Sequence, residues 1–163
     1  ATVTSPAAAP MPAAPAPRPG TVRPDTAGQA YDTAMATFRA REYGQAVLDL
    51  MDFIAQHPKH ALAGNAQYWI GEAYLSLARG YSNAEQTDRA SESLNQAVQE
   101  FRKVLANYPR AEKVSAALYK EALALIELKQ PQQAQARLQY LVDNFPQAEE
   151  TPHARERLAA LKK

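Results

Sequence analysis

A phrase that ends in proline recurs three times in this chain and constrains its fold more than any other feature. Twelve residues before each proline stands an alanine, and eight residues before it stands a large apolar residue. The three sets are Ala46, Leu50 and Pro58; Ala97, Phe101 and Pro109; and Ala134, Leu138 and Pro146. Residues four apart share a helix face, and a proline prevents the helix from continuing. The chain therefore contains three helices with the same sequence pattern.

A tyrosine opens each unit further upstream, which indicates a second, earlier helix in each. The spacing from Tyr31 to Pro58 in the first unit equals the spacing from Tyr119 to its proline in the third. Tyr68 stands further from its own proline, so the middle unit contains a 14-residue insertion, expected around Gly80–Asn95. Two helices per unit make each unit a helical hairpin.

The insertion has two alternative structures. Fourteen residues are close to four helical turns, so both helices of the middle hairpin could be two turns longer, with the turn at Gly80–Asn83. The segment could instead form a loop. The run Ala90–Ala97 consists mostly of good helix formers and favours the longer helices.

The pattern predicts seven helices in all. The expected helices span about 27–40 and 43–56 in the first unit, 62–79 and roughly 87–107 in the second, 112–128 and 131–144 in the third, and then 152–161. Small residues at Ala34, Gly71 and Ala122 allow the two helices of each hairpin to approach closely. A terminal amphipathic helix is what a solenoid needs to cover its last open face.

The middle unit also matches a known repeat signature. Ile70-Gly71-x-x-Tyr74, then Ala97-x3-Phe101, then Pro109 follow the tetratricopeptide pattern. We therefore predict an all-α, right-handed α-solenoid of about three tetratricopeptide hairpins with a C-terminal capping helix. The expected division is a linker at 1–26 and a repeat domain at 27–163, with units at about 27–61, 62–111 and 112–148 and the capping helix at 152–162.

The segment 1–24 differs in composition from the rest, because it includes seven prolines and seven alanines. Such a segment buries too little apolar surface to offset its ordering entropy, so we expect a disordered, semi-stiff linker. The alternative is a proline-rich docking peptide around Pro12–Pro15, but such patterns arise by chance in Ala/Pro tracts. In the whole chain, 18 basic residues balance 17 acidic ones, which argues against nucleic acid as a partner. Its apolar runs are too short for membrane insertion.

Residues that carry catalytic or metal chemistry are sparse. Cysteine is absent, which excludes disulfides, thiolate metal sites and cysteine nucleophiles. His57 and His60 flank a proline and lack the helical spacing of a ligand pair, and His153 stands alone. The acidic residues are scattered, and we expect them on solvated helix faces. The sequence therefore predicts no catalytic residue, no cofactor and no metal.

Several phrases together resemble one family. A Pro/Ala-rich segment precedes Ala30-Tyr31-x-x-Ala34, the run Arg41–Ala46 and the run Asn65–Tyr74. In this order they resemble the C-terminal domain of the YbgF/CpoB proteins. The resemblance implies a periplasmic protein that binds TolA of the Tol-Pal system, with a peptidoglycan synthase as a further partner. It also implies coordination of peptidoglycan synthesis with outer-membrane constriction in cell division, and oligomerisation through a coiled coil before the linker.

Two other functions remain open at this point. One is a BamD-like component of outer-membrane protein assembly, which is also a tetratricopeptide protein. The other is a repeat domain that regulates an enzyme within a larger protein. A lipobox cysteine in the precursor would indicate the first, and a catalytic domain before residue 1 would indicate the second.

The first helices of the hairpins should line a concave groove that binds a partner. The candidates lie on one helix face in each unit. They are Tyr31, Met35, Phe38, Asn65, Tyr68, Glu72, Leu75, Tyr119, Leu123 and Ile126. The alternative role is packing between repeats, which is expected for the aliphatic members and is as well supported as binding for the tyrosines. Trp69 is expected to pack toward a neighbouring repeat, and Lys120 is the only cation expected in the groove.

Overall fold

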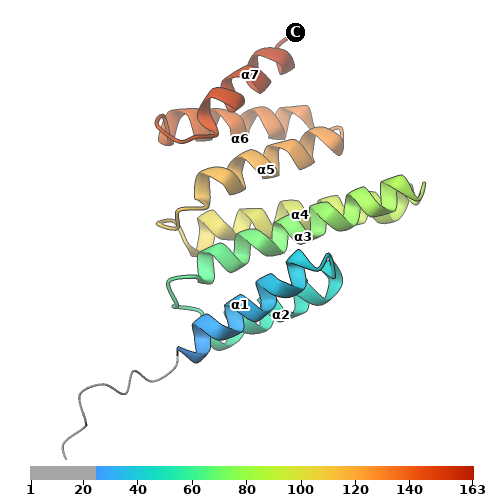
Figure 1. Cartoon of the computed structure of the whole chain (residues 1–163). Coiled ribbons are helices and arrows are strands. Elements are labelled where there is room, and N and C mark those ends of the chain that lie inside the picture. The colour runs from blue at the N-terminus through green and yellow to red at the C-terminus, as the bar shows by residue number, and fades with distance from the viewer. Residues whose placement is uncertain (1–24) are drawn as a thin grey trace, which may run out of the picture.

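The computed structural model describes residues 25–163, and seven α-helices account for most of them (Figure 1). No strand occurs in this part of the chain. The helices are α1 (Thr26–Arg39), α2 (Tyr43–Gln56), α3 (Ala63–Asn83), α4 (Thr87–Asn107), α5 (Val114–Glu127), α6 (Pro131–Asn144) and α7 (Thr151–Leu161). The predicted linker falls outside the described residues except for Asp25 and Thr26. These two instead form the N-cap and the first residue of α1.

Three helical hairpins stack one upon another, and α7 lies on the last of them (Figure 1). Each helix packs against the next one in sequence, and α3 also contacts α5. The predicted all-α solenoid with a terminal helix is therefore confirmed. Pro131 and Pro152 stand in the first turns of α6 and α7, where the missing N–H has no helical partner to lose.

The turn inside each hairpin has the same backbone conformation. Arg41, Glu85 and Lys129 have φ angles of 64°, 59° and 61°, in the left-handed region. After each of them, an N–H bonds back to a carbonyl five residues earlier, as in Gln86 N to Tyr81 O at 2.8 Å. This left-handed closure is usually made by glycine. Here none of the three is glycine, so the sequence carried no signal for the left-handed conformation of these residues.

The insertion of the middle unit is helical. Helices α3 and α4 have 21 residues each, whereas the helices of the other two hairpins have 14. The end of α3 and the beginning of α4 project beyond the neighbouring hairpins (Figure 1). The longer-helix alternative is thus correct, but the expected turn at Gly80–Asn83 is wrong. The chain turns at residues 84–86, because Glu85 takes the left-handed position and Gly80 is not needed there.

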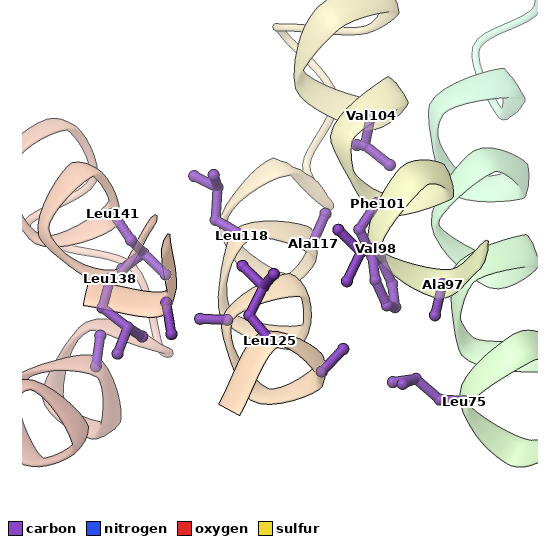
Figure 2. Packing of buried hydrophobic residues seen from close by; sticks show 14 of the residues in the cluster. Leu75, Ala97, Val98, Phe101, Val104, Ala117, Leu118, Leu125, Leu138 and Leu141 are labelled. Carbon is purple, nitrogen blue, oxygen red and sulfur yellow. The ribbon is translucent and has the colours of Figure 1, made fainter. Parts of the chain in front are cut away.

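Small residues make the close helix contacts that the sequence indicated. Ala46, Ala97 and Ala134 are fully buried in the second helices. At Gly71 of α3, an added Cβ would lie 2.5 Å from Cε1 of Phe101 in α4, so only glycine fits against that ring. Around α5, Ala117 points toward α4, and Leu118 points toward α6 (Figure 2). The central hairpins are therefore packed on both sides.

We expect Ala97→Leu to lower the free energy of unfolding by about 1–3 kcal/mol, because no room exists beside this buried alanine for three more carbons. Thermal and urea denaturation of both proteins measure the difference. The matched control is Gln99→Leu, an exposed change on the same helix, which should leave the stability nearly unchanged. An unchanged melting temperature for Ala97→Leu would contradict the packing.

Two acidic residues contradict the expectation that carboxylates lie on solvated faces. Glu100 is 4% exposed and Glu121 is 1% exposed. The Glu100 carboxylate accepts hydrogen bonds from Gln67 Nε2 at 2.6 Å and from Lys103 Nζ at 2.9 Å. A helix between two others has little free surface, so its polar residues need partners on the neighbouring helices. Periodicity within α4 can indicate Lys103, three residues after Glu100, but it cannot reveal Gln67 of α3.

Candidate protein-binding surface

The predicted surface is formed by one side of α1, α3 and α5, which we call the first-helix face. Three of its ten members are buried and act in packing: Met35, Tyr68 and Leu75. The others keep part of their surface accessible: Tyr31, Phe38, Asn65, Glu72, Tyr119, Leu123 and Ile126. The structure thus places seven predicted residues where a partner could touch them.

Tyr68 lies between the core, which its ring contacts, and the first-helix face, where its hydroxyl meets Glu72. It is 7% exposed, and its ring packs against Trp69 and Phe101 with centroid distances of 5.2 and 5.7 Å. Its hydroxyl donates a hydrogen bond to Glu72 Oε1 at 2.9 Å. Burial raises the pKa of Tyr68, and the nearby Glu72 carboxylate raises it further, so the phenol stays protonated. Packing is therefore the main role of this side chain.

The other two tyrosines are more accessible. The Tyr31 ring lies 5.7 Å from that of Phe53 in α2, and burial raises the pKa of its hydroxyl. Tyr119 in α5 lies 6.3 Å from the ring of His153 in α7. Both side chains are partly exposed and combine an apolar ring with a polar hydroxyl, which suits a residue in contact with a partner.

Two lysines lie on the first-helix face, which corrects the expectation that Lys120 is its only cation. Lys120 Nζ forms an ion pair with Glu72 Oε1 at 3.2 Å. Lys113, just before α5, places its Nζ over the rings of Tyr68 and Trp69, 5.3 and 5.6 Å from their centroids. Sequence spacing missed Lys113 because it belongs to a connector and not to the helical stripe.

Trp69 packs toward a neighbouring repeat, as expected. Its ring makes an edge contact with Phe38 of α1, with centroids 5.1 Å apart. It remains partly exposed beneath the Lys113 amine. Close by, Asn65 Nδ2 donates to Glu112 Oε1 at 3.2 Å. The centre of the face is thus aromatic, and positively and negatively charged groups surround it.

Pockets lie at both ends of α5. At its start, one of about 320 Å³ is lined by Glu112, Lys113, Ser115, Ala116, Glu149 and Glu150. At its end, a smaller pocket is lined by Leu75, Arg79, Leu94, Lys120, Leu123 and Glu127. The second pocket brings together Leu75 and Leu123, two predicted residues from different units. Another pocket of about 320 Å³, beside the α3–α4 turn, shares Arg79, Leu94 and Glu127 with it.

This arrangement suits contact with a polypeptide. Among residues 25–163, no group of three or more His, Asp or Glu side chains is placed to hold a metal ion. His60 instead has a structural role, since its Nδ1 accepts the Leu62 N–H at 3.1 Å. None of the seven helices is long and apolar enough to cross a membrane. The open, mixed aromatic and polar surface resembles a protein-binding face more than an enclosed small-molecule site.

A family model described as outer membrane lipoprotein, YfiO, matches residues 22–162. The chain belongs to the YfiO family. No curated protein matches the sequence. Membership in YfiO supports a tetratricopeptide-type scaffold of the cell envelope, a kind of protein that is in general not enzymatic. The match agrees with the tetratricopeptide type of repeat that the resemblance to YbgF/CpoB proteins implied, but it does not identify the YbgF/CpoB family.

Proposed function

We propose that this YfiO-family chain is a periplasmic scaffold that binds a partner protein through its first-helix face. The observation that carries the proposal is the centre of that face, where Lys113 lies over Tyr68 and Trp69 and Lys120 pairs with Glu72. Aromatic surface with charged groups at its edge is typical of protein-binding sites. In this proposal residues 1–24 serve as a linker, and the helical repeat domain from Asp25 onward is the binding unit.

The partner segment should lie along α5, between the two pockets. Apolar side chains would contact Leu123 and Tyr119, and a carboxylate of the partner would approach the Lys113 amine. Lys113 contacts aromatic rings and has no ion pair within the described residues, so its charge is available to an acidic group. A helical or an extended segment could present such residues.

TolA is the first candidate partner. The similarity of Ala30–Ala34, Arg41–Ala46 and Asn65–Tyr74 to YbgF/CpoB proteins supports it. With TolA as partner, the scaffold would coordinate peptidoglycan synthesis, through a peptidoglycan synthase, with outer-membrane constriction during cell division.

A BamD-like role in outer-membrane protein assembly is the second candidate. The YfiO match over residues 22–162 favours it, because the family is one of outer-membrane lipoproteins. The two roles require different partners, so binding experiments separate them.

Tyr119→Ala is the variant that tests the binding face. Truncation of a central contact typically costs about 2 kcal/mol, so we expect about thirtyfold weaker binding. Tyr119 is preferable to Tyr68, whose truncation would also leave a cavity in the core. The measurement is titration with purified TolA and, separately, with the purified outer-membrane assembly machinery. Binding to one of them selects the corresponding role.

The matched control is Tyr140→Ala, which removes an exposed tyrosine from α6, outside the first-helix face. We expect its affinity to stay within about twofold of the wild type. Circular dichroism should show that both variants are folded. If Tyr119→Ala bound as tightly as Tyr140→Ala, the first-helix face would not be the binding surface.

A further inference from the structure

Three aromatic side chains form a partly exposed strip where α1 meets α3. Trp69 of α3 lies in the middle of it, and its ring contacts that of Phe38 of α1 at a centroid distance of 5.1 Å. Tyr31, two turns before Phe38 on α1, has its hydroxyl beside Trp69. Each of the three side chains keeps part of its surface accessible. We call Tyr31, Trp69 and Phe38 the aromatic strip.

A strip of this kind suits a proline-rich segment. Such segments already favour the extended polyproline II conformation, so they lose little entropy when they dock on aromatic side chains. The aromatic strip is about 10 Å long, because seven residues of helix separate Tyr31 from Phe38. Three to four residues of polyproline II, at roughly 3.1 Å each, span this length.

The chain itself contains such a segment, and it joins the helix that carries the strip. Residues 1–24 include seven prolines and lead directly into Asp25, the N-cap of α1. Polyproline II has three residues per turn, so Pro12, Pro15 and Arg18 would share one side of it. Two prolines and a cation would then face the same surface.

The distances along the chain allow this segment to reach the strip. Arg18 precedes Asp25 by seven residues, a reach of roughly 22 Å, whereas Tyr31 lies only about 9 Å along the helix from Asp25. Gly20 permits the reversal of direction that folding back requires. With Arg18 at the Tyr31 end, Pro12 would lie about 19 Å further along, so the segment covers the whole strip.

Charge favours the same arrangement. Residues 1–24 contain two arginines and no acidic residue. Burial raises the pKa of the Tyr31 hydroxyl, and the carboxylates of Asp32 and Glu112 raise it further, so both lie near this end of the strip. Asp32 forms no ion pair within the described residues, so its charge is available to Arg18.

We propose that residues 12–18 dock on the aromatic strip of their own chain, with Pro12 and Pro15 against the rings and Arg18 beside Asp32. A short tether supplies an effective concentration of about 1 mM, so a contact with a Kd of about 1 mM is occupied half of the time. The strip belongs to the first-helix face, so the docked segment would compete with a partner there. This competition rests on the proposed function, but the docking does not.

Fluorescence of Trp69 measures the docking, since it is the single tryptophan of the chain. Acrylamide quenching of the full chain is compared with that of the triple variant Pro12→Ala, Pro15→Ala and Arg18→Glu. With half occupancy in the wild type, we expect about twofold stronger quenching in the variant. Circular dichroism should show equal helix content in both.

The matched control is Pro10→Ala with Pro17→Ala. It removes two prolines that lie on the other sides of a polyproline II segment, so it should be quenched like the wild type. Equal quenching of the wild type and the triple variant would overturn the proposal. Protection that increases with protein concentration would also overturn it, because the segment would then dock on a second copy and not on its own chain.

Charge reversal tests the position of Arg18. Arg18→Glu and Asp32→Arg should each increase the quenching, and the two together should restore the wild-type value. Failure of the pair to restore it would contradict the contact between these two residues. No partner protein enters these measurements, so a negative result would leave the proposed function standing.

Discussion

Replacement of Phe101 by alanine is expected to lower the free energy of unfolding by about 4 kcal/mol. Phe101 is 1% exposed, and its ring lies against Gly71 and Tyr68 at the centre of the α3–α4 hairpin. The substitution removes this packing and leaves a cavity, because the long helices on either side cannot close fully. Urea denaturation measures the change. A loss below about 1 kcal/mol would show that the hairpin can collapse around the site.

Gly71→Ala provides the matched test of that contact. In the wild type its Cβ would lie 2.5 Å from the Phe101 ring, so the variant should be less stable. In the Phe101→Ala background the ring is gone, and the new methyl group should stabilise the protein through cavity filling and the higher helix propensity of alanine. The effect of Gly71→Ala should therefore change sign between the two backgrounds. An equal effect in both would contradict the contact.

Glu121→Ala is expected to cost about 3 kcal/mol of unfolding free energy, because it removes the shared partner of two arginines. Glu121 Oε1 accepts a hydrogen bond from Arg102 Nε of α4 at 2.7 Å and forms an ion pair with Arg137 Nε of α6 at 2.9 Å. Each arginine side chain is 33% exposed, so it can partly regain water when the carboxylate is removed. The expected loss therefore lies at the lower end of the roughly 3–5 kcal/mol that removal of one partner from a buried ion pair costs.

Glu127→Ala is the control for Glu121→Ala, since it removes an exposed carboxylate from the same helix. We expect it to change the free energy of unfolding by less than about 0.5 kcal/mol. If the two variants were equally stable, the network across α4, α5 and α6 would contribute nothing to the fold.

The pH dependence gives a second test of the same carboxylate. Burial raises the pKa of Glu121 above its usual 4.5, and the two arginines offset this only in part. The folded state then binds the proton more readily than the unfolded state, so the stability that Glu121 contributes is lost as pH rises through its folded pKa. The stability of the wild type relative to Glu121→Gln should therefore fall as the pH rises from about 4 to about 7. A rise would mean that the arginines dominate.

The sequence alone determined the helices and their grouping into hairpins. Alanines such as Ala97 sit where two helix backbones meet, and a proline eight residues after Phe101 stops the helix. These are short-range signals that recur in register, so the helix starts at Tyr43 and Pro131 were predicted, and the start of α4 was expected close to its observed position at Thr87. The longer distance from tyrosine to proline in the middle unit likewise indicated the two extra turns of each helix.

Only the tertiary structure decided how side chains from different helices combine. Glu121 finds one arginine in the helix before its own and another in the helix after it, and no pattern within α5 indicates either. Lys113 reaches Tyr68 and Trp69 because a connector crosses above α3. The turn at Glu85 depends on a left-handed residue that is not glycine.

The same division applies to the candidate surfaces. The repeated tyrosine positions were visible in the sequence, but their burial was not. Tyr68 is buried because α3 has neighbouring helices on both sides, and Tyr119 is partly exposed because α5 is less covered on this face. Leu48 and Met51 have the composition of core residues, yet they lie outside because α2 has α1 and α3 on its opposite side only. Helical periodicity defines the faces of a helix, and only the packing of its neighbours decides which face remains free.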